Sequence, residues 1–323
     1  MPDYKAPLRD IKFVMNELLN SEQHYANLEG AEDATPDMVD AIIAEGAKFC
    51  EQVLSPLNQV GDKEGCTWSE DGVKTPTGFK EAYQQYVEGG WPSMNADPNY
   101  GGQGLPGSLG IVMSEMVGTA NWSFGMYPGL SHGATNTIEE HGTEEQKQKY
   151  VPRLATGEVI SSFWLTEPDV GSDAASLKTR ADKDGDHYIL NGTKRYITNG
   201  PEAGLYTVMA RTDQNNKGAG GITAFIVEGD TPGISRGKAD VKMGQKGAHT
   251  CDIIFDNCRV PAENIIGGKE GVGFKTAMKV LDRGRLHISA ICVGVATRLI
   301  EDAVNFAAAR KQFGQPNIQH LSL

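Results

Sequence analysis

Residues 163–173 read Phe-Trp-Leu-Thr-Glu-Pro-Asp-Val-Gly-Ser-Asp, and this stretch decides how the chain is interpreted. Pro168 and Gly171 favour an irregular backbone between two structured regions. Such a loop exposes main-chain N–H groups and small hydroxyls, which suit the polar edge of a heterocycle or a phosphate. The alternative is an ordinary loop in which Ser172 or Asp173 caps a helix.

A second motif, Tyr-Ile-Thr-Asn-Gly, follows at residues 196–200. Tyr196 and Thr198 lie two positions apart on one predicted strand, so their side chains share a face. An aromatic ring and a hydroxyl on one face suit stacking on a planar ring and hydrogen bonding to its edge. The alternative is a half-buried strand with a solvent-facing threonine.

The region around the second motif is rich in strand patterns. Residues 187–190 and 193–198 flank Asn-Gly at 191–192, which predicts a hairpin with a type I′ turn. Further strands are predicted at residues 205–210, 222–227 and 252–255. These spacings indicate an antiparallel sheet or a small barrel.

The strands lie between two helical regions. Residues 1–158 have helical spacing of apolar residues, and Thr143 opens a capping box with Gln146. From Gly273 the helical pattern returns. We therefore predict an α+β fold. Its parts are a helical N-terminal domain at 1–158 (with 1–35 as an extension), a middle β domain at 159–268, and an incomplete C-terminal helical domain at 269–323.

The segment Gly-Gln-Gly-Leu-Pro-Gly at residues 102–107 matches the glycine spacing of a dinucleotide-binding fingerprint but lacks its structural context. No strand is predicted before it, and Pro106 sits inside it. The order helices, strands, helices also differs from the alternating pattern of a Rossmann fold. We interpret the segment as a loop between helices.

Composition and charge exclude several other classes. The net charge of −12 argues against nucleic acid as a partner. The seven histidines lack metal-binding spacing, so no metal site is predicted. Five scattered cysteines indicate reduced thiols. No apolar run is long enough to span a bilayer and no signal peptide is predicted, so a cytoplasmic location is expected.

The two motifs together resemble the flavin-contacting motifs of the acyl-CoA dehydrogenase family. The resemblance implies FAD as cofactor, with hydrogen bonds from both threonines to the isoalloxazine edge and a serine contacting both flavin and acyl-CoA. Tyrosine at 196 replaces the family's usual tryptophan and still supplies an aromatic face. The cofactor-binding residues implied are Phe163, Leu165, Thr166, Gly171, Ser172, Tyr196 and Thr198.

Later segments extend the resemblance to most of residues 40–315. Leu-Asp-Arg-Gly-Arg at 281–285 implies that Asp282 and Arg285, with Ser172, approach the substrate. Arg310 begins Arg-Lys-Gln-Phe-Gly, which implies contact with the flavin of a neighbouring subunit, hence a homodimer or homotetramer.

The reaction implied is α,β-dehydrogenation of an acyl-CoA thioester, in which a carboxylate removes the α-proton. Electron-transfer flavoprotein is the usual acceptor in this family. Most members carry the base on a late loop, which we expect beyond Leu323, and a minority carry it at the position of Gly284. No catalytic base is assigned here, and apolar helix faces are expected to be exposed. The alternative is a non-catalytic flavin- or acyl-CoA-binding remnant.

Overall fold

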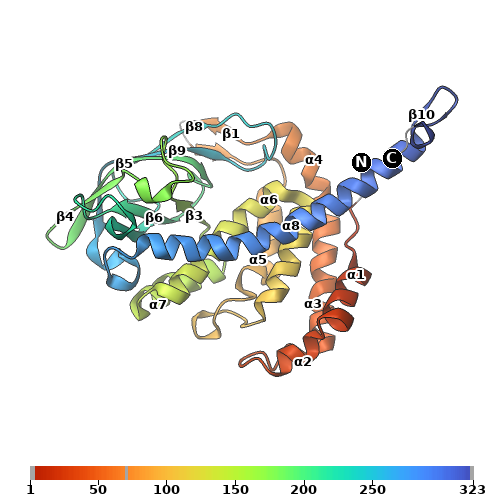
Figure 1. The fold of residues 1–323 in the computed structure, drawn as a ribbon, viewed down its shortest axis with the longest axis horizontal. Helices are drawn as coiled ribbons and strands as arrows, with labels where there is room; N and C mark the ends of the chain where they lie inside the picture. The colour runs from red at the N-terminus through yellow and green to blue at the C-terminus, as the bar shows by residue number, and fades with distance from the viewer. Residues whose placement is uncertain (1–3, 70–71, 321–323) are drawn as a thin grey trace.

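The computed structural model describes residues 4–69 and 72–320. The termini of the predicted extension and of the last domain, 1–3 and 321–323, lie outside the described residues. Helices gather on one side of the molecule and a curled sheet on the other, and one long helix crosses both (Figure 1). This arrangement confirms the predicted α+β fold.

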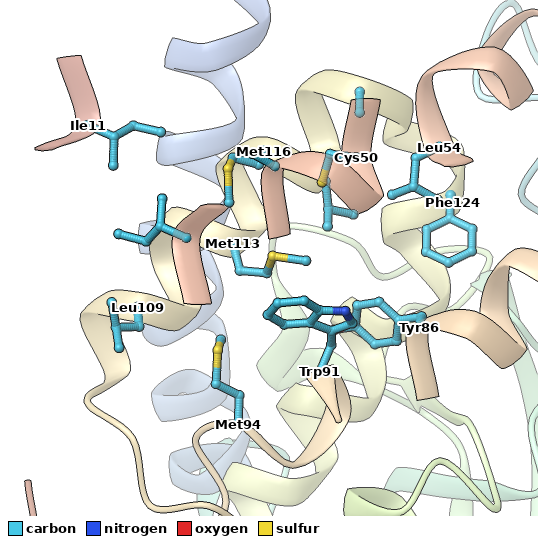
Figure 2. Close-up of a cluster of buried hydrophobic side chains, with 14 of the residues drawn as sticks. Ile11, Cys50, Leu54, Tyr86, Trp91, Met94, Leu109, Met113, Met116 and Phe124 are labelled. Carbon is cyan, nitrogen blue, oxygen red and sulfur yellow. The ribbon is translucent and has the colours of Figure 1, made fainter. Parts of the chain in front are cut away.

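Among the described residues, the N-terminal part contains seven α-helices, and all of them except α7 contribute to one apolar core. Figure 2 shows the centre of this core, where Trp91, Met113 and Phe124 meet side chains from neighbouring helices. A two-stranded hairpin, β1 (Thr67–Ser69) with β2 (Gly72–Lys74), makes this part not purely helical. The helices are α1 (Leu8–Lys12), α2 (Ser21–Ala26), α3 (Pro36–Phe49), α4 (Ser55–Glu64), α5 (Phe79–Glu88), α6 (Gly107–His141) and α7 (Glu144–Ala155).

Local sequence explains how these helices begin and bend. Thr143 and Gln146 form the predicted capping box at the start of α7. Within α6 the backbone is extended at Asn121, whose side-chain oxygen accepts from the N–H of Phe124 at 3.1 Å. Asn121 therefore acts as an internal N-cap, and the second half of α6 leaves at a new angle.

The sheet has the strand order β3-β6-β4-β5-β9-β8, and β7 pairs with β6. The predicted sheet was antiparallel, but β3 and β4 each pair in parallel with β6. The loop between β3 and β4 returns the chain to the same sheet in the same direction, a connection that alternation of side chains cannot reveal. The strands are β3 (Ser161–Trp164), β4 (Arg180–Asp184), β5 (His187–Thr198), β6 (Leu205–Arg211), β7 (Ile222–Glu228), β8 (Ile234–Ala239) and β9 (Thr250–Pro261).

The predicted turn at Asn191–Gly192 was wrong. Residues 187–198 form one strand, and its register against β9 shifts between Leu190 and Gly192. A Cβ at Gly192 would lie 2.7 Å from the Thr179 hydroxyl, so glycine serves a bulge with a close approach. The true hairpin joins β4 to β5, with Gly185 at φ +63°.

The C-terminal helix α8 (Gly273–Ala309) is about 55 Å long and packs across α6. Close packing needs small residues, because a Cβ at Gly118 would lie 2.6 Å from Ile291. The second half of α8 extends beyond the other helices (Figure 1). Apolar side chains are exposed along it, including Val293, Leu299, Ile300 and Phe306. No helix among the described residues is long and apolar enough to cross a membrane.

Candidate active site

The two sequence motifs lie next to each other in the structure. The N–H of Arg195 on β5 donates to the carbonyl oxygen of Thr166 at 2.9 Å, which ties the loop after β3 to β5. The hydroxyl of Ser162 on β3 donates to the carbonyl oxygen of Thr198 at 2.5 Å. The strand end and the loop therefore form one continuous edge.

Glu167 anchors the loop after β3 through hydrogen bonds to residues on and before the neighbouring strands. One carboxylate oxygen accepts from the Thr179 N–H at 3.0 Å and hydroxyl at 2.6 Å, and from the Lys194 ammonium at 2.8 Å. The other accepts from the Lys178 N–H at 2.6 Å. Lys194 also donates to the carbonyl oxygen of Leu165 at 3.2 Å. Glu167 is 6% exposed and Lys194 is fully buried, so water does not screen this pair.

The ionisation of the pair follows from these contacts. Burial alone would raise the pKa of Glu167, but Lys194 and the surrounding N–H and O–H donors lower it below its ordinary value. Burial lowers the pKa of Lys194, and the attraction of Glu167 opposes that shift. The loop is therefore held to β5 by a buried, hydrogen-bonded ion pair.

A second bulge shapes the end of β5. The register against β9 shifts between Lys194 and Ile197, and Tyr196 has φ +57°. The sequence predicted that Tyr196 and Thr198 share one face of a regular strand. Because of this bulge, strand alternation does not place them on one face. Tyr196 is 60% exposed, and the Arg195 guanidinium lies 4.8 Å from the centre of its ring. Asn199, also at positive φ, donates to the carbonyl oxygen of Met126 at 3.0 Å and so links β5 to α6.

The remaining predicted cofactor-binding residues are at this same edge of the sheet. Leu165 is buried and Phe163 half-buried, whereas Gly171 and Ser172 are exposed. Thr166 and Thr198 are half-buried. Within the described residues, neither threonine hydroxyl has a hydrogen-bond partner. Both are therefore available to a ligand.

A cavity of about 260 Å³ begins at this edge and runs between α6 and α8. Phe163 of the first motif lines it, and Gly284 of α8 lines it as well. Most of the wall is apolar, with Met113, Val117 and Ile291 among its residues. Within the described part of the chain, no aspartate or glutamate lines the cavity. Such a space fits an acyl chain better than a charged metabolite.

The predicted substrate-contacting residues of α8 lie outside this cavity. Asp282 and Arg285 are exposed and form an ion pair with each other, while Arg283 and Gly284 between them line the wall. Arg310 is exposed and directly follows α8, whose C-terminal end lies well away from the sheet (Figure 1). Their roles toward substrate and flavin stay predictions.

Two titratable side chains with little solvent exposure lie close together in the loops that follow β5 and precede β9. Glu202 and His249 approach to 3.9 Å, and His249 is 1% exposed. Both carboxylate oxygens of Glu202 and both ring nitrogens of His249 lack a hydrogen-bond partner among the described residues. Burial raises the pKa of Glu202 to about 7 and lowers the pKa of His249 to about 4.

These shifts predict a pH-dependent effect of Glu202→Gln. The folded-state pKa of Glu202 lies above its ordinary 4.5, so its unfavourable contribution is absent below pH 4.5 and grows until about pH 7. The glutamine variant should gain on the order of 2 kcal/mol in unfolding free energy at pH 8 relative to pH 5. Urea unfolding of both chains at the two pH values measures this difference. An equal effect at both pH values would contradict it.

His249→Gln is a control for which the opposite pH dependence of stability is expected. Its folded-state pKa lies below the ordinary 6.5, so its unfavourable contribution grows as the pH falls from 6.5 toward 4. We expect His249→Gln to gain stability relative to the parent chain at pH 4.5 and not at pH 8, the reverse of Glu202→Gln.

Comparison with known protein families agrees with this architecture. Residues 38–158 match the acyl-CoA dehydrogenase N-terminal domain, 162–258 the middle domain and 271–323 the C-terminal domain. The mitochondrial isobutyryl-CoA dehydrogenase of Dictyostelium discoideum is 41% identical over 73% of this chain and 56% of its own length. A probable acyl-CoA dehydrogenase of Mycobacterium tuberculosis is 40% identical over 82% of this chain and 68% of its own.

Solved structures give the same result. Butyryl-CoA dehydrogenase from Megasphaera elsdenii superposes with a TM-score of 0.78 at 34% identity, covering 88% of this chain and 73% of that one. A chain in a structure described as the electron transferring flavoprotein of Acidaminococcus fermentans has a TM-score of 0.77 at 38% identity, covering 86% and 70%. This chain therefore spans between about half and three quarters of the proteins it matches.

The helices, the sheet and the paired motifs have the architecture of the flavin-dependent oxidoreductases that this chain matches. The chain belongs to the acyl-CoA dehydrogenase family, whose cofactor is FAD.

The residues at the sheet edge fit this cofactor. Thr166 and Thr198 have hydroxyls free to bond the polar edge of a flavin ring, and Tyr196 offers an exposed aromatic face. The side-chain oxygen of Asn199 is buried without a partner among the described residues. Uncharged donors and acceptors beside an aromatic ring are the chemistry that isoalloxazine requires.

Several residues that shape the site were missed from the sequence. Glu167 and Lys194 are separated by the β4–β5 hairpin, and their pairing is visible only once the loop is folded onto β5. His132 and His287 line the cavity, yet a lone histidine in a helical pattern gives no functional indication. Glu167 in the first motif was the one available hint, because a charged residue that becomes buried needs a partner.

Proposed function

We propose that this chain supplies the flavin- and acyl-CoA-binding parts of an acyl-CoA dehydrogenase that introduces an α,β double bond. The observation that carries the proposal is the cavity that starts at Phe163, beside the joined motifs, and runs past Gly284. An acyl chain in this cavity would place its thioester end at the same edge as the free hydroxyls of Thr166 and Thr198.

The position of each residue gives its proposed role toward the flavin or the acyl-CoA. Thr166, Thr198 and Tyr196 hold and orient the isoalloxazine ring, and Ser172, exposed in the anchored loop, contacts both flavin and acyl-CoA. FAD, when bound, accepts the hydride that leaves the β-carbon. Asp282 and Arg285 approach the CoA portion from the exposed side of α8.

The oligomeric state, the electron acceptor and the cellular location form part of the same proposal. Arg310 and the exposed apolar face of α8 support a homodimer or homotetramer in which Arg310 reaches the neighbouring flavin. Electron-transfer flavoprotein is the proposed acceptor. We place the protein in the cytoplasm, since its five cysteines are free thiols. The predicted domain limits at 158 and 268 are proposed with it.

An anaerobic visible spectrum of the FAD-loaded chain, before and after adding a series of acyl-CoAs, tests the function. Bleaching of the flavin band supports dehydrogenation, and a shift without bleaching supports the alternative, a ligand-binding remnant. Failure to bind added FAD would contradict both.

Removing the two free hydroxyls tests the flavin site. Thr166→Val and Thr198→Val should each weaken FAD binding about tenfold, because each removes one hydrogen bond to the ring edge. Thr193→Val, on β5 but outside the site edge, is the matched control. Fluorescence quenching on FAD titration measures the three dissociation constants. Equal values for all the variants would remove these threonines from the site.

A further inference from the structure

Two histidines stand out in the apolar wall of the acyl cavity. His132 on α6 and His287 on α8 both line it, and they are close enough to influence each other's ionisation. Each is held by a neighbour that also lines the cavity: Tyr86 Oη lies 3.3 Å from His132 Nε2, and Ser114 Oγ lies 2.8 Å from His287 Nδ1.

The other nitrogen of each ring is available to a ligand. Among the described residues, neither His132 Nδ1 nor His287 Nε2 has a hydrogen-bond partner, and neither is an enclosed buried atom. Burial, with a further contribution from His287, lowers the pKa of His132 to about 4, and burial lowers the pKa of His287. Both rings are therefore neutral near pH 7, and each offers hydrogen-bonding capacity without charge.

These nitrogens lie where an acyl chain would pass. His287 lies three residues after Gly284 on α8, a rise of about 4.5 Å, and both residues line the cavity, so an acyl chain that passes Gly284 also passes His287. A hydrocarbon chain in the cavity would strip water from the ring nitrogens and give nothing in return. That loss disfavours binding of plain chains, because a buried polar group without a partner is costly.

We propose that this cavity selects acyl groups that carry a neutral hydrogen-bonding substituent, such as a hydroxyl, ether or carbonyl oxygen, over plain hydrocarbon chains of equal length. The inference rests on the proposed function, because it requires the acyl chain to occupy this cavity. A carboxylate substituent is not favoured, since neutral imidazoles do not compensate its charge and the one cation of the described wall, Arg283, is already paired with Glu140 at 3.1 Å.

Binding of matched ligands tests the selection. Anaerobic calorimetry on the FAD-loaded full chain compares hexanoyl-CoA with its 4-, 5- and 6-hydroxy derivatives. We expect at least one hydroxy derivative to bind about tenfold more tightly than hexanoyl-CoA. His132→Leu and His287→Leu should bring that ratio toward one, and His287→Gln should keep part of it. His24→Leu, the same change at an exposed residue of α2, should leave the ratio unchanged.

The possible results separate the two proposals. Binding of hexanoyl-CoA as tight as that of every hydroxy derivative would overturn the selection while leaving the proposed function intact. A ratio that survives both leucine substitutions would overturn the role of the histidines. Absence of binding by all four ligands would overturn the proposed function, and the selection with it.

Discussion

Lys194→Met is expected to destabilise the chain by about 3–5 kcal/mol, because it leaves the Glu167 carboxylate buried without its cation. The methionine fills similar space but cannot donate to Glu167 or to the carbonyl oxygen of Leu165. Urea unfolding at pH 7 measures the loss. Since the loop after β3 is anchored through Glu167, FAD binding should weaken at the same time.

The chain offers a matched control for this prediction. Lys178 also pairs with a carboxylate of the loop, Asp169 at 3.0 Å, but both side chains are at least 70% exposed. Lys178→Met should change the unfolding free energy by less than about 1 kcal/mol, since exposed ion pairs contribute little.

A double variant separates the lost pair from the charge left behind. Adding Glu167→Gln to Lys194→Met removes the unpaired buried charge, so it should recover part of the stability. A Lys194→Met chain as stable as the Lys178→Met chain would show that the buried pair does not hold the loop.

The comparison of sequence with structure shows which inferences local patterns support. The capping box at Thr143 was predictable because its donors and acceptors lie within one turn. Asn191–Gly192 has the same local quality but was misinterpreted, because the structure uses Gly192 for a close approach to Thr179, which lies just before β4. The hairpin is formed instead by the turn at Gly185, where Asp-Gly was equally visible.

The site shows the same limit. The motif residues around Thr166 and Thr198 could be named from the sequence, and the structure brings their backbones together. The bulge at Tyr196 was not predictable, because alternation assumes a regular strand. The cavity histidines were not predictable either, since their meaning depends on how α6 crosses α8. Contacts between distant segments carry no local pattern.

Gly284→Glu is expected to raise the rate of flavin reduction by acyl-CoA by about 10²–10⁴-fold over this chain. Gly284 lines the cavity, whose wall contains no carboxylate among the described residues, and the family resemblance makes this position one that can carry the base. A Cβ placed there has no described atom within 4 Å, so the helix tolerates a side chain at this position. Replacing a helix-interior glycine also favours the helix by roughly 0.5–1 kcal/mol.

The pH dependence gives this prediction a second readout. A carboxyl group in a mostly apolar cavity has a raised pKa, and only its deprotonated form accepts the α-proton. The rate of flavin bleaching in Gly284→Glu should therefore increase with pH through that raised pKa and then level off. Gly284→Gln has the same shape without the charge, and it should react no faster than the parent chain.

Anaerobic stopped-flow spectra of the parent chain, Gly284→Glu and Gly284→Gln decide whether the parent chain is a working dehydrogenase or a ligand-binding remnant without a base. A slow parent chain that binds acyl-CoA, with a fast glutamate variant, would show that the cofactor and substrate are already positioned and that only a base is lacking. A parent chain that bleaches quickly would show that one of its own groups already removes the α-proton. A glutamate variant that binds acyl-CoA but stays slow would mean that the acyl chain passes Gly284 with its α-carbon out of reach, and the cavity would then need a different occupant.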